Sequence, residues 1–358
     1  MKKNDENIIL NGHEVLKGTR RLDEEKLEGF NDWKKLDTLS CLQEIWYKGN
    51  PTQLIDYIEN RTLIEFLCLL NHKQKIIDIS KTNIKKLSID TTSEVILNEK
   101  IDTLILFGKN LGQLTITNSR QGEELNLCIT LEKEKLPDYH LPLLEDLTLL
   151  YVQKLNIDDL AEWYPNLKNL FISGKTGIFE NIQSLSKLKN LEKIYIEDMF
   201  GFSGEDFPTQ EGLPNLQQLG VQRIPIQAAK IIEKSFKDIQ KLEIIDPKSD
   251  KWLQTNLNNP FHHWSDSEYI PKKHAKEAFN AYKKTLAQLE KLNKPYKEKE
   301  IKKILKQFVE IFNNIDKKNS VGTIEVEEIT DAYDSLLTAI NIKNSSPYSK
   351  WFDKWRSF

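Results

Sequence analysis

One arrangement of apolar and polar positions recurs along the middle of the chain. Its frame is an apolar residue, two variable residues, an apolar residue, one variable residue and an apolar residue. A repeat of about 20 to 29 residues with this pattern is typical of leucine-rich repeats. Five copies follow one another in steps of 23, 24, 25 and 23 residues: LEDLTL from Leu144, LKNLFI from Leu167, LEKIYI from Leu191, LQQLGV from Leu216 and IQKLEI from Ile239.

Less regular copies precede these five. They are IKKLSI from Ile84, IDTLIL from Ile101 and the fragment ELNLCI at 124–129. In an extended strand, successive side chains point to opposite faces. Frame positions 4 and 6 therefore point inward, whereas positions 3, 5, 7 and 8 point outward. Because one copy cannot bury its apolar face alone, the copies must stack. The pattern predicts an α/β solenoid, a curved leucine-rich repeat parallel sheet with helical N- and C-terminal caps.

The segments that return from one frame to the next change character along the chain. After Leu144 they place apolar residues at helical spacing, as in NIDDLAEWYPN, IFENIQSLSKLKN and IQAAKIIEKSFKDIQK. Before residue 130 they alternate in period two, as in EVILN and LGQLTIT. We therefore expect β-like returns first and helical returns later.

Three regions follow from this reading. Residues 1–75 are interpreted as a mostly helical N-terminal cap, in which LQEIWY and LIEFLCL also fit the frame loosely. Residues 76–257 form the solenoid. Residues 258–358 form a closing segment and a helical region, with an apolar stripe on the helix that begins after Pro271 and two further helices around 298–316 and 323–340.

Composition places the chain among globular proteins, with 39% hydrophobic and 29% charged residues and a net charge of −3. No run reaches the roughly 18 to 20 apolar residues that a membrane helix needs. The N-terminus, MKKNDENIIL, has no signal-peptide pattern. Three cysteines (Cys41, Cys68 and Cys128) lie far apart in apolar contexts and are interpreted as buried structural thiols. We expect a cytoplasmic bacterial protein.

The stretch NNPFHHWSDSEYIPKKHAKEAF, residues 258–279, concentrates candidate chemistry. A metal or catalytic centre there would need His262, His263 and Asp266 or His274 to converge. Adjacent histidines point in different directions, and zinc sites prefer spaced pairs. We instead expect Phe261, Trp264 and Tyr269 to plug the open end of the apolar ladder.

The run NPF-x-x-W, followed by IP and an Ala/Lys-rich helix, resembles the segment that closes the repeats in a group of bacterial leucine-rich repeat proteins. The later FNNIDKKNSVGTIEVEEITDA is similar to the tail of that group, so the resemblance covers about residues 80–340. This chain has His262 and His263 where the group has an Arg-Asp-like pair. The resemblance implies a scaffold that binds other proteins. Because some relatives are encoded beside bacterial competition systems, it also suggests an immunity role.

Other motifs point away from catalysis. The stretch from Asp316 to Glu327 fails as an EF-hand loop because Lys318 occupies the third position and the glycine is one place late. GKTG at 174–177 lacks the spacing of a phosphate-binding loop and is interpreted as a turn. We expect no enzyme, no cofactor and no metal.

Charge is distributed unevenly. Residues 120–222 hold 9 Lys/Arg against 17 Asp/Glu, a local charge of −8, whereas residues 271–310 hold 12 against 5, a local charge of +7. The lysine-rich helices are the alternative site, for nucleic acid or another anion. They also match the expected appearance of a solvated helix face, because glutamates are interspersed with the lysines.

The outward positions of the repeats supply the candidate binding surface. Phe171 and Tyr195 occupy position 5 on adjacent strands, about 5 Å apart, beside acidic residues. The expected partner-binding residues are Tyr151, Phe171, Lys193, Tyr195, Glu197, Asp198, Gln218, Arg223 and Glu243. Aromatic residues in the loop 197–210 extend this rim or fold back as a local core.

The sequence is compatible with three functions. The first is a non-catalytic module that binds a protein partner on the concave repeat surface, in its sharper form an immunity protein that neutralises a toxin or another basic protein. The second is a nucleic-acid or anion-binding adaptor that uses the C-terminal lysines. The third is an enzyme that uses His262, His263 and Asp266. We expect the first.

Overall fold

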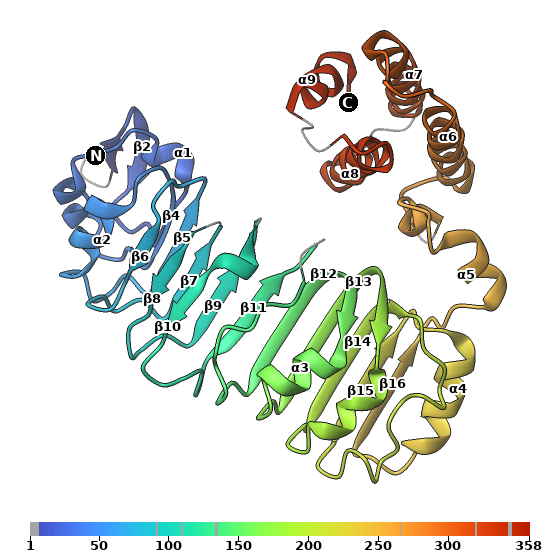
Figure 1. Cartoon of the computed structure of the whole chain (residues 1–358). Helices are drawn as coiled ribbons and strands as arrows, with labels where there is room; N and C mark the ends of the chain where they lie inside the picture. Colours follow the sequence, from blue (N-terminus) through green and yellow to red (C-terminus); the bar gives the residue numbers. More distant parts are fainter. Residues whose placement is uncertain are drawn as a thin grey trace, which may run out of the picture. The chain divides into compact units, whose positions relative to one another are not determined.

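A computed structural model of the chain describes residues 7–90, 92–108, 110–132, 135–265, 267–318, 321–342 and 346–358 (Figure 1). The chain divides into two compact units, which we call the sheet unit (Met1–Asp250) and the helical unit (Lys251–Phe358). This division lies a few residues before the expected boundary at 257/258. No helix among the described residues has the length and apolar character required to span a bilayer.

The sheet unit contains an 11-stranded parallel sheet, so the mixed α/β fold with a large parallel sheet is confirmed. Its strands follow one another in chain order, except that the strands of a separate three-stranded sheet come between some of them in the sequence. They are β3 (Arg21–Leu22), β4 (Glu44–Lys48), β5 (Phe66–Leu70), β7 (Lys86–Ile89), β9 (Thr103–Leu106), β11 (Asn126–Thr130), β12 (Asp146–Asn156), β13 (Asn169–Glu180), β14 (Lys193–Phe200), β15 (Gln218–Gln222) and β16 (Lys241–Ile245).

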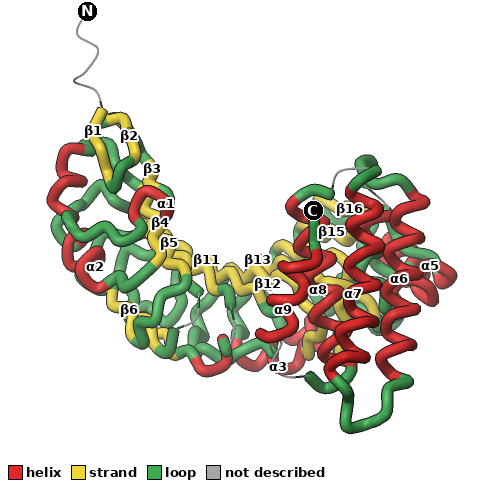
Figure 2. The backbone as a smooth tube through the Cα atoms, turned by 90° about the horizontal axis from the view of Figure 1, so that it is seen from above, coloured by secondary structure: helices red, strands yellow, loops and turns green. Residues whose placement is uncertain are grey.

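The returns between these strands follow the predicted change of character. Early returns form a three-stranded parallel sheet of β6 (Ile76–Asp78), β8 (Glu94–Ile96) and β10 (Thr115–Thr117). Later returns contain α3 (Ile157–Trp163), the 3-10 helix η3 (Ile182–Lys187) and α4 (Ile226–Ser235); η2 (Leu111–Gln113) is a short 3-10 turn. Figure 2 shows α2 and α3 on the same side of the row of strands.

The expectation of a mostly helical segment before residue 75 is wrong. That segment holds β1 (Asn7–Leu10) and β2 (His13–Leu16), an antiparallel pair, together with β3, β4 and β5 of the large sheet. Its helices are short: α1 (Glu24–Leu27), η1 (Trp33–Thr38) and α2 (Thr52–Ile58). The segment LQEIWY forms strand β4 and not a helix, because pairing with the parallel strand β5 buries Ile45 and Tyr47.

The register of the strands reproduces the sequence frame. Leu147 pairs with Leu170, Leu170 with Ile194, and Ile194 with Leu219. These position-4 residues and the position-6 residues two places later are buried in one continuous core. The frame therefore fixed which face of each strand lies inside.

Asparagines placed one residue before the frame join successive copies. Asn166 Nδ2 donates to the carbonyl oxygen of Pro142 at 2.9 Å, Asn190 Nδ2 to Asn166 Oδ1 at 3.2 Å, and Asn215 Nδ2 to the carbonyl oxygen of Lys189 at 2.9 Å. All three bonds lie at exposed positions, where one hydrogen bond contributes only about 0.5 to 1.5 kcal/mol. These bonds repeat at the spacing of the frame and help to hold neighbouring copies in register.

The helical unit has a core of its own. Its elements are α5 (Asp250–Asn256, which begins at the boundary), η4 (His262–Ser265), α6 (Lys272–Glu290), α7 (Glu298–Asp316), α8 (Thr323–Ala339) and α9 (Ser346–Trp355). Phe261 and Trp264 pack against Phe312 of α7, with ring centroids 5.2 and 6.0 Å away. They therefore belong to the helical core instead of plugging the repeat core as expected, and Tyr269 is 85% exposed.

A buried histidine lies in the turn after β5. The side chain of His72 is 1% exposed, and its Nε2 lies 3.3 Å from Oδ1 of Asp90, which follows β7. Burial lowers the pKa of His72 from the usual 6.5, and the Asp90 carboxylate opposes that shift only in part. The folded protein therefore resists protonation of His72 more than the unfolded chain does.

We expect the free energy of unfolding to fall as the pH drops below 6.5 and to level off below the lower pKa of folded His72. As the pH falls, the unfolded chain binds a proton at His72 before the folded protein does, and this binding stabilises the unfolded chain. Urea denaturation between about pH 7 and pH 5 measures the slope. His72→Gln should flatten it, whereas His140→Gln, at a histidine that is 88% exposed, should leave it unchanged. An equal slope in His72→Gln would contradict the assignment.

Candidate functional site

The outward side chains of β12 to β16 form two parallel rows on one face of the sheet. Cα pairing places Phe171 beside Tyr195, and Tyr195 beside Gly220. The position-5 row is Thr148, Phe171, Tyr195, Gly220 and Glu243, and the position-3 row is Asp146, Asn169, Lys193, Gln218 and Lys241. Phe171 and Tyr195 belong to consecutive copies of the frame, and their predicted adjacency is confirmed.

Phe171 and Tyr195 form a stacked pair, with ring centroids 5.0 Å apart and planes 5° from parallel. The hydroxyl of Tyr195 donates to Oε1 of Gln222. On its other side the Tyr195 ring covers Gly220, where an added Cβ would lie 2.5 Å from Cδ2 of the ring. The absence of a side chain at Gly220 therefore lets the Tyr195 ring take the position that stacks on Phe171. Both rings remain partly exposed.

Gly220→Ala tests this dependence. The new methyl group would overlap the Tyr195 ring, and overpacking of this kind costs about 1 to 3 kcal/mol. We expect the variant to lower the free energy of unfolding in urea by about 1 kcal/mol, and we expect the loss to disappear in the Tyr195→Ala background. Gly112→Ala is the control because nothing lies within 4 Å of its added Cβ. Equal losses in both backgrounds would show that the ring and Gly220 are not coupled.

A groove of about 270 Å³ lies between the two rows. Its floor is formed by the backbone of the position-4 residues, from Leu147 to Leu219, whose side chains are buried on the other face, and it also reaches Asn126 of β11. Six strands at about 4.8 Å spacing make it roughly 24 Å long. Of the expected residues, Phe171, Lys193, Tyr195, Gln218 and Glu243 line this groove. Asp146, Asn169 and Lys241 line it too; Lys241 could have been found by reading position 3 of the last frame.

The acidic residues beyond the aromatic pair are engaged by Arg223. Its Nε donates to Oδ1 of Asp198 at 2.8 Å and its Nη2 to Oδ2 at 2.7 Å, and Nη2 also contacts Glu197. Burial alone would lower the pKa of Arg223, but the two carboxylates outweigh it and raise that pKa. The three expected residues form one ion cluster, in which Arg223 offsets one of the two negative charges.

In four of the five copies, the last outward position of the frame adopts a left-handed backbone. Tyr151, Asp198, Arg223 and Asp246 have φ values of 56, 51, 51 and 49°. Such φ values are uncommon in residues other than glycine. Tyr151 is 52% exposed, and Lys175 Nζ lies 5.9 Å from its ring centroid. Tyr151 therefore stands near the end of the position-5 row without lining the groove.

The loop 197–210 forms a local core. Met199, Phe200, Phe202 and Phe207 are at most 9% exposed. Phe202 packs against Phe179, and Phe207 against Phe236, with centroids 5.7 and 5.9 Å apart. The loop aromatics thus support the sheet rather than extend the binding face.

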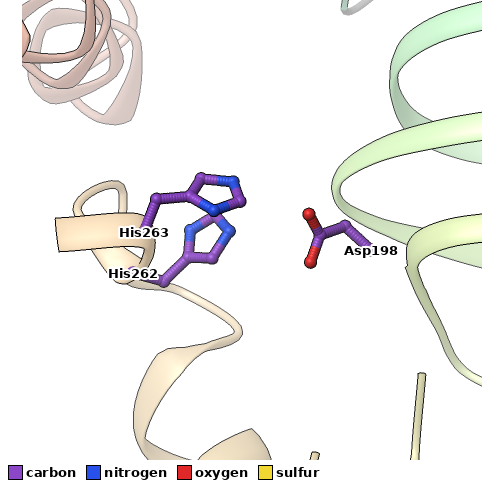
Figure 3. A group of neighbouring side chains, drawn as sticks. All are labelled: Asp198, His262 and His263. Atoms are coloured by element: carbon purple, nitrogen blue, oxygen red, sulfur yellow. The ribbon is translucent and has the colours of Figure 1, made fainter. Parts of the chain in front are cut away.

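The histidine pair lies on η4 of the helical unit. The rings of His262 and His263 are 3.8 Å apart between centroids (Figure 3), and Nδ1 of His262 lies 3.1 Å from the carbonyl oxygen of Asn259. His274 lies on α6, and Asp266 falls outside the described residues. In the EF-hand-like stretch, Asp316 Oδ1 accepts from the backbone N–H of Val321 at 3.0 Å, as in an ordinary helix-to-helix turn.

The lysine-rich helices are α6 and α7, as expected. Several of their lysines contact other side chains: Lys302 Nζ lies 4.9 Å from the Trp351 ring centroid, and Lys306 lies 3.7 Å from Glu310. All three cysteines were expected to be buried, but Cys41 is exposed and Cys128 is partly exposed, so only Cys68 is fully buried. Burial raises the pKa of Cys68 and of Cys128, which keeps these two thiols protonated.

Comparison of the sequence with protein-family models found no match, and comparison with curated proteins found no significant similarity.

Proposed function

We propose that the sheet unit is a curved leucine-rich repeat solenoid that binds a protein partner on the face formed by β12 to β16. Three observations support the solenoid: the 23- to 25-residue steps of the frame, the parallel register that is continuous over frame positions 3 to 6, and the asparagine bonds that recur at the same spacing. Curvature follows if the returns occupy more width than the 4.8 Å strand spacing.

The observation that carries the binding proposal is the stacked pair of Phe171 and Tyr195 beside the groove. Aromatic side chains held in place before binding lose little entropy and are enriched among residues that dominate protein interfaces. Gly220 and Gln222 hold Tyr195 in this way. The groove runs across the six strands β11 to β16 and is about 24 Å long, a length that suits an extended segment or loop of a folded partner.

The proposed role is binding alone and needs no catalytic residue in this chain. In its sharper form the partner is a toxin of a bacterial competition system, which the sheet unit neutralises by covering the toxin's active surface. This role rests on the resemblance of the NPFHHW closing segment to bacterial leucine-rich repeat proteins, together with the exposed aromatic pair.

The experiment is affinity capture from the source organism with the purified full chain, followed by chemical cross-linking of the captured protein. We expect capture to survive nuclease treatment, and we expect cross-links on the outward residues of β12 to β16. Capture that disappears with nuclease and falls steeply with salt would instead favour the lysines of α6 and α7 as a nucleic-acid site, since phosphate contacts are strongly salt-dependent. Cross-links confined to the helical unit would overturn the proposed surface.

A further inference from the structure

We infer that the groove recognises a partner segment that carries an apolar side chain next to a carboxylate. This inference rests on the proposed function, because it names the chemistry of the partner at the same surface. It departs from the sequence-based expectation of a basic partner, and the reason is the pairing of charges on this face.

The acidic side chains of the face already have partners. Arg223 binds both carboxylate oxygens of Asp198 and also contacts Glu197. Glu243 lies 3.0 Å from Lys241 in the same strand, and Asp146 accepts from Nδ2 of Asn169 at 2.6 Å. A partner's cation would have to compete with these contacts. The acidic residues that made the sequence look suited to a basic partner are therefore largely unavailable.

Lys193 has no ion pair in the described part of the chain, and it stands in the middle of the position-3 row. Its neighbours in that row are the amides Asn169 and Gln218, and the Gln218 amide can donate to an oxygen beside Lys193. Asp146 and Glu243 each lie two strands away, about 10 Å, where salt largely screens their repulsion of an incoming anion. The centre of the groove therefore favours a carboxylate.

An apolar side chain can bind at the same time. The position-5 row, with the Phe171 and Tyr195 rings, and the position-3 row, with Lys193, line the groove on either side of the position-4 backbone. Lys193 and Tyr195 are two residues apart on β14, about 7 Å, so the two groups of the partner would bind within about that distance of each other. The carboxylate and the apolar group must therefore be close neighbours in the partner.

Small indole probes test this inference without a known partner. The probes are N-acetyltryptophan, its neutral amide, and tryptamine, which carry a carboxylate, no charge and an ammonium group. Binding is followed on the full chain through the NMR signals of the Phe171 and Tyr195 rings, assigned with Phe171→Leu and Tyr195→Phe. We expect millimolar binding of N-acetyltryptophan, three- to tenfold tighter than binding of the amide, and the weakest binding for tryptamine.

Lys193→Met should abolish the preference for the carboxylate while retaining binding of the amide, because methionine keeps much of the apolar stem but not the charge. Lys272→Met, at an exposed lysine of the helical unit, is the matched control and should keep the preference. Tightest binding of tryptamine, a carboxylate preference that survives in Lys193→Met, or no shift of either ring with any probe would each overturn the inference.

The two proposals fail differently. If a captured protein depends on Phe171 and Tyr195 but the probes show no carboxylate preference, the binding face stands and only the chemistry assigned to Lys193 falls. If the probes behave as expected but the captured protein is indifferent to Phe171 and Tyr195, the groove binds a small anionic group and the protein-binding function falls.

Discussion

Ile172→Asp should unfold the sheet unit. Ile172 is fully buried and lies in register between Leu149 and Ile196 on the neighbouring strands. The change removes about 1.5 to 3 kcal/mol of apolar burial and places a carboxylate in the apolar core, which costs several kcal/mol more. A loss of this size approaches the whole stability of a typical domain, about 5 to 15 kcal/mol. Because each copy is stabilised by its neighbours, damage at β13 also removes support from β12 and β14.

Circular dichroism and urea denaturation measure this effect. We expect the β signal to be lost while much of the helical signal persists, since α6 to α9 pack around a separate core. The matched control is Ile76→Asp, at an isoleucine of β6 that is 48% exposed, which should change the free energy of unfolding by less than about 1 kcal/mol. A wild-type urea midpoint in Ile172→Asp would refute the inward orientation of the frame.

Phe171→Ala combined with Tyr195→Asp should abolish partner capture while the protein remains folded. Both rings are partly exposed and stack on each other, so their removal opens no cavity inside the main core. Truncating residues that dominate an interface typically costs 2 kcal/mol or more each, so affinity should fall at least about a hundredfold. The added carboxylate would also stand beside Glu197, which disfavours an acidic partner segment further.

The comparison uses a captured partner, titrated against wild-type and variant protein by calorimetry, with unfolding curves recorded in parallel. Tyr269→Asp serves as the control because that tyrosine is 85% exposed on the helical unit. Undiminished affinity in the double variant would reject the face of β12 to β16 as the binding surface. Lost affinity together with a lowered urea midpoint would mean that the rings support the fold instead, and the single Phe171→Leu variant would then separate the two effects.

The sequence by itself determined the parallel sheet, the inward and outward faces of its strands, the change from β-like to helical returns, and three of the C-terminal helices. These features depend on apolar periodicity, which is written locally and repeats often enough to outweigh a single irregular position. It also placed Phe171 beside Tyr195, because equal frame positions on adjacent strands must pair.

Only the tertiary structure decided the rest. The short helical patterns before residue 75 gave way to strands β4 and β5, since pairing in the sheet outweighs weak local propensity. Phe261 and Trp264 joined a second core whose other members, such as Phe312, lie far along the chain. Side-chain contacts decided the charge of the binding face: Arg223 reaches back 25 residues to Asp198, Lys241 pairs with Glu243, and Lys193 is the groove lysine without an ion pair among the described residues. Such pairings depend on side-chain reach across strands, which no local pattern encodes.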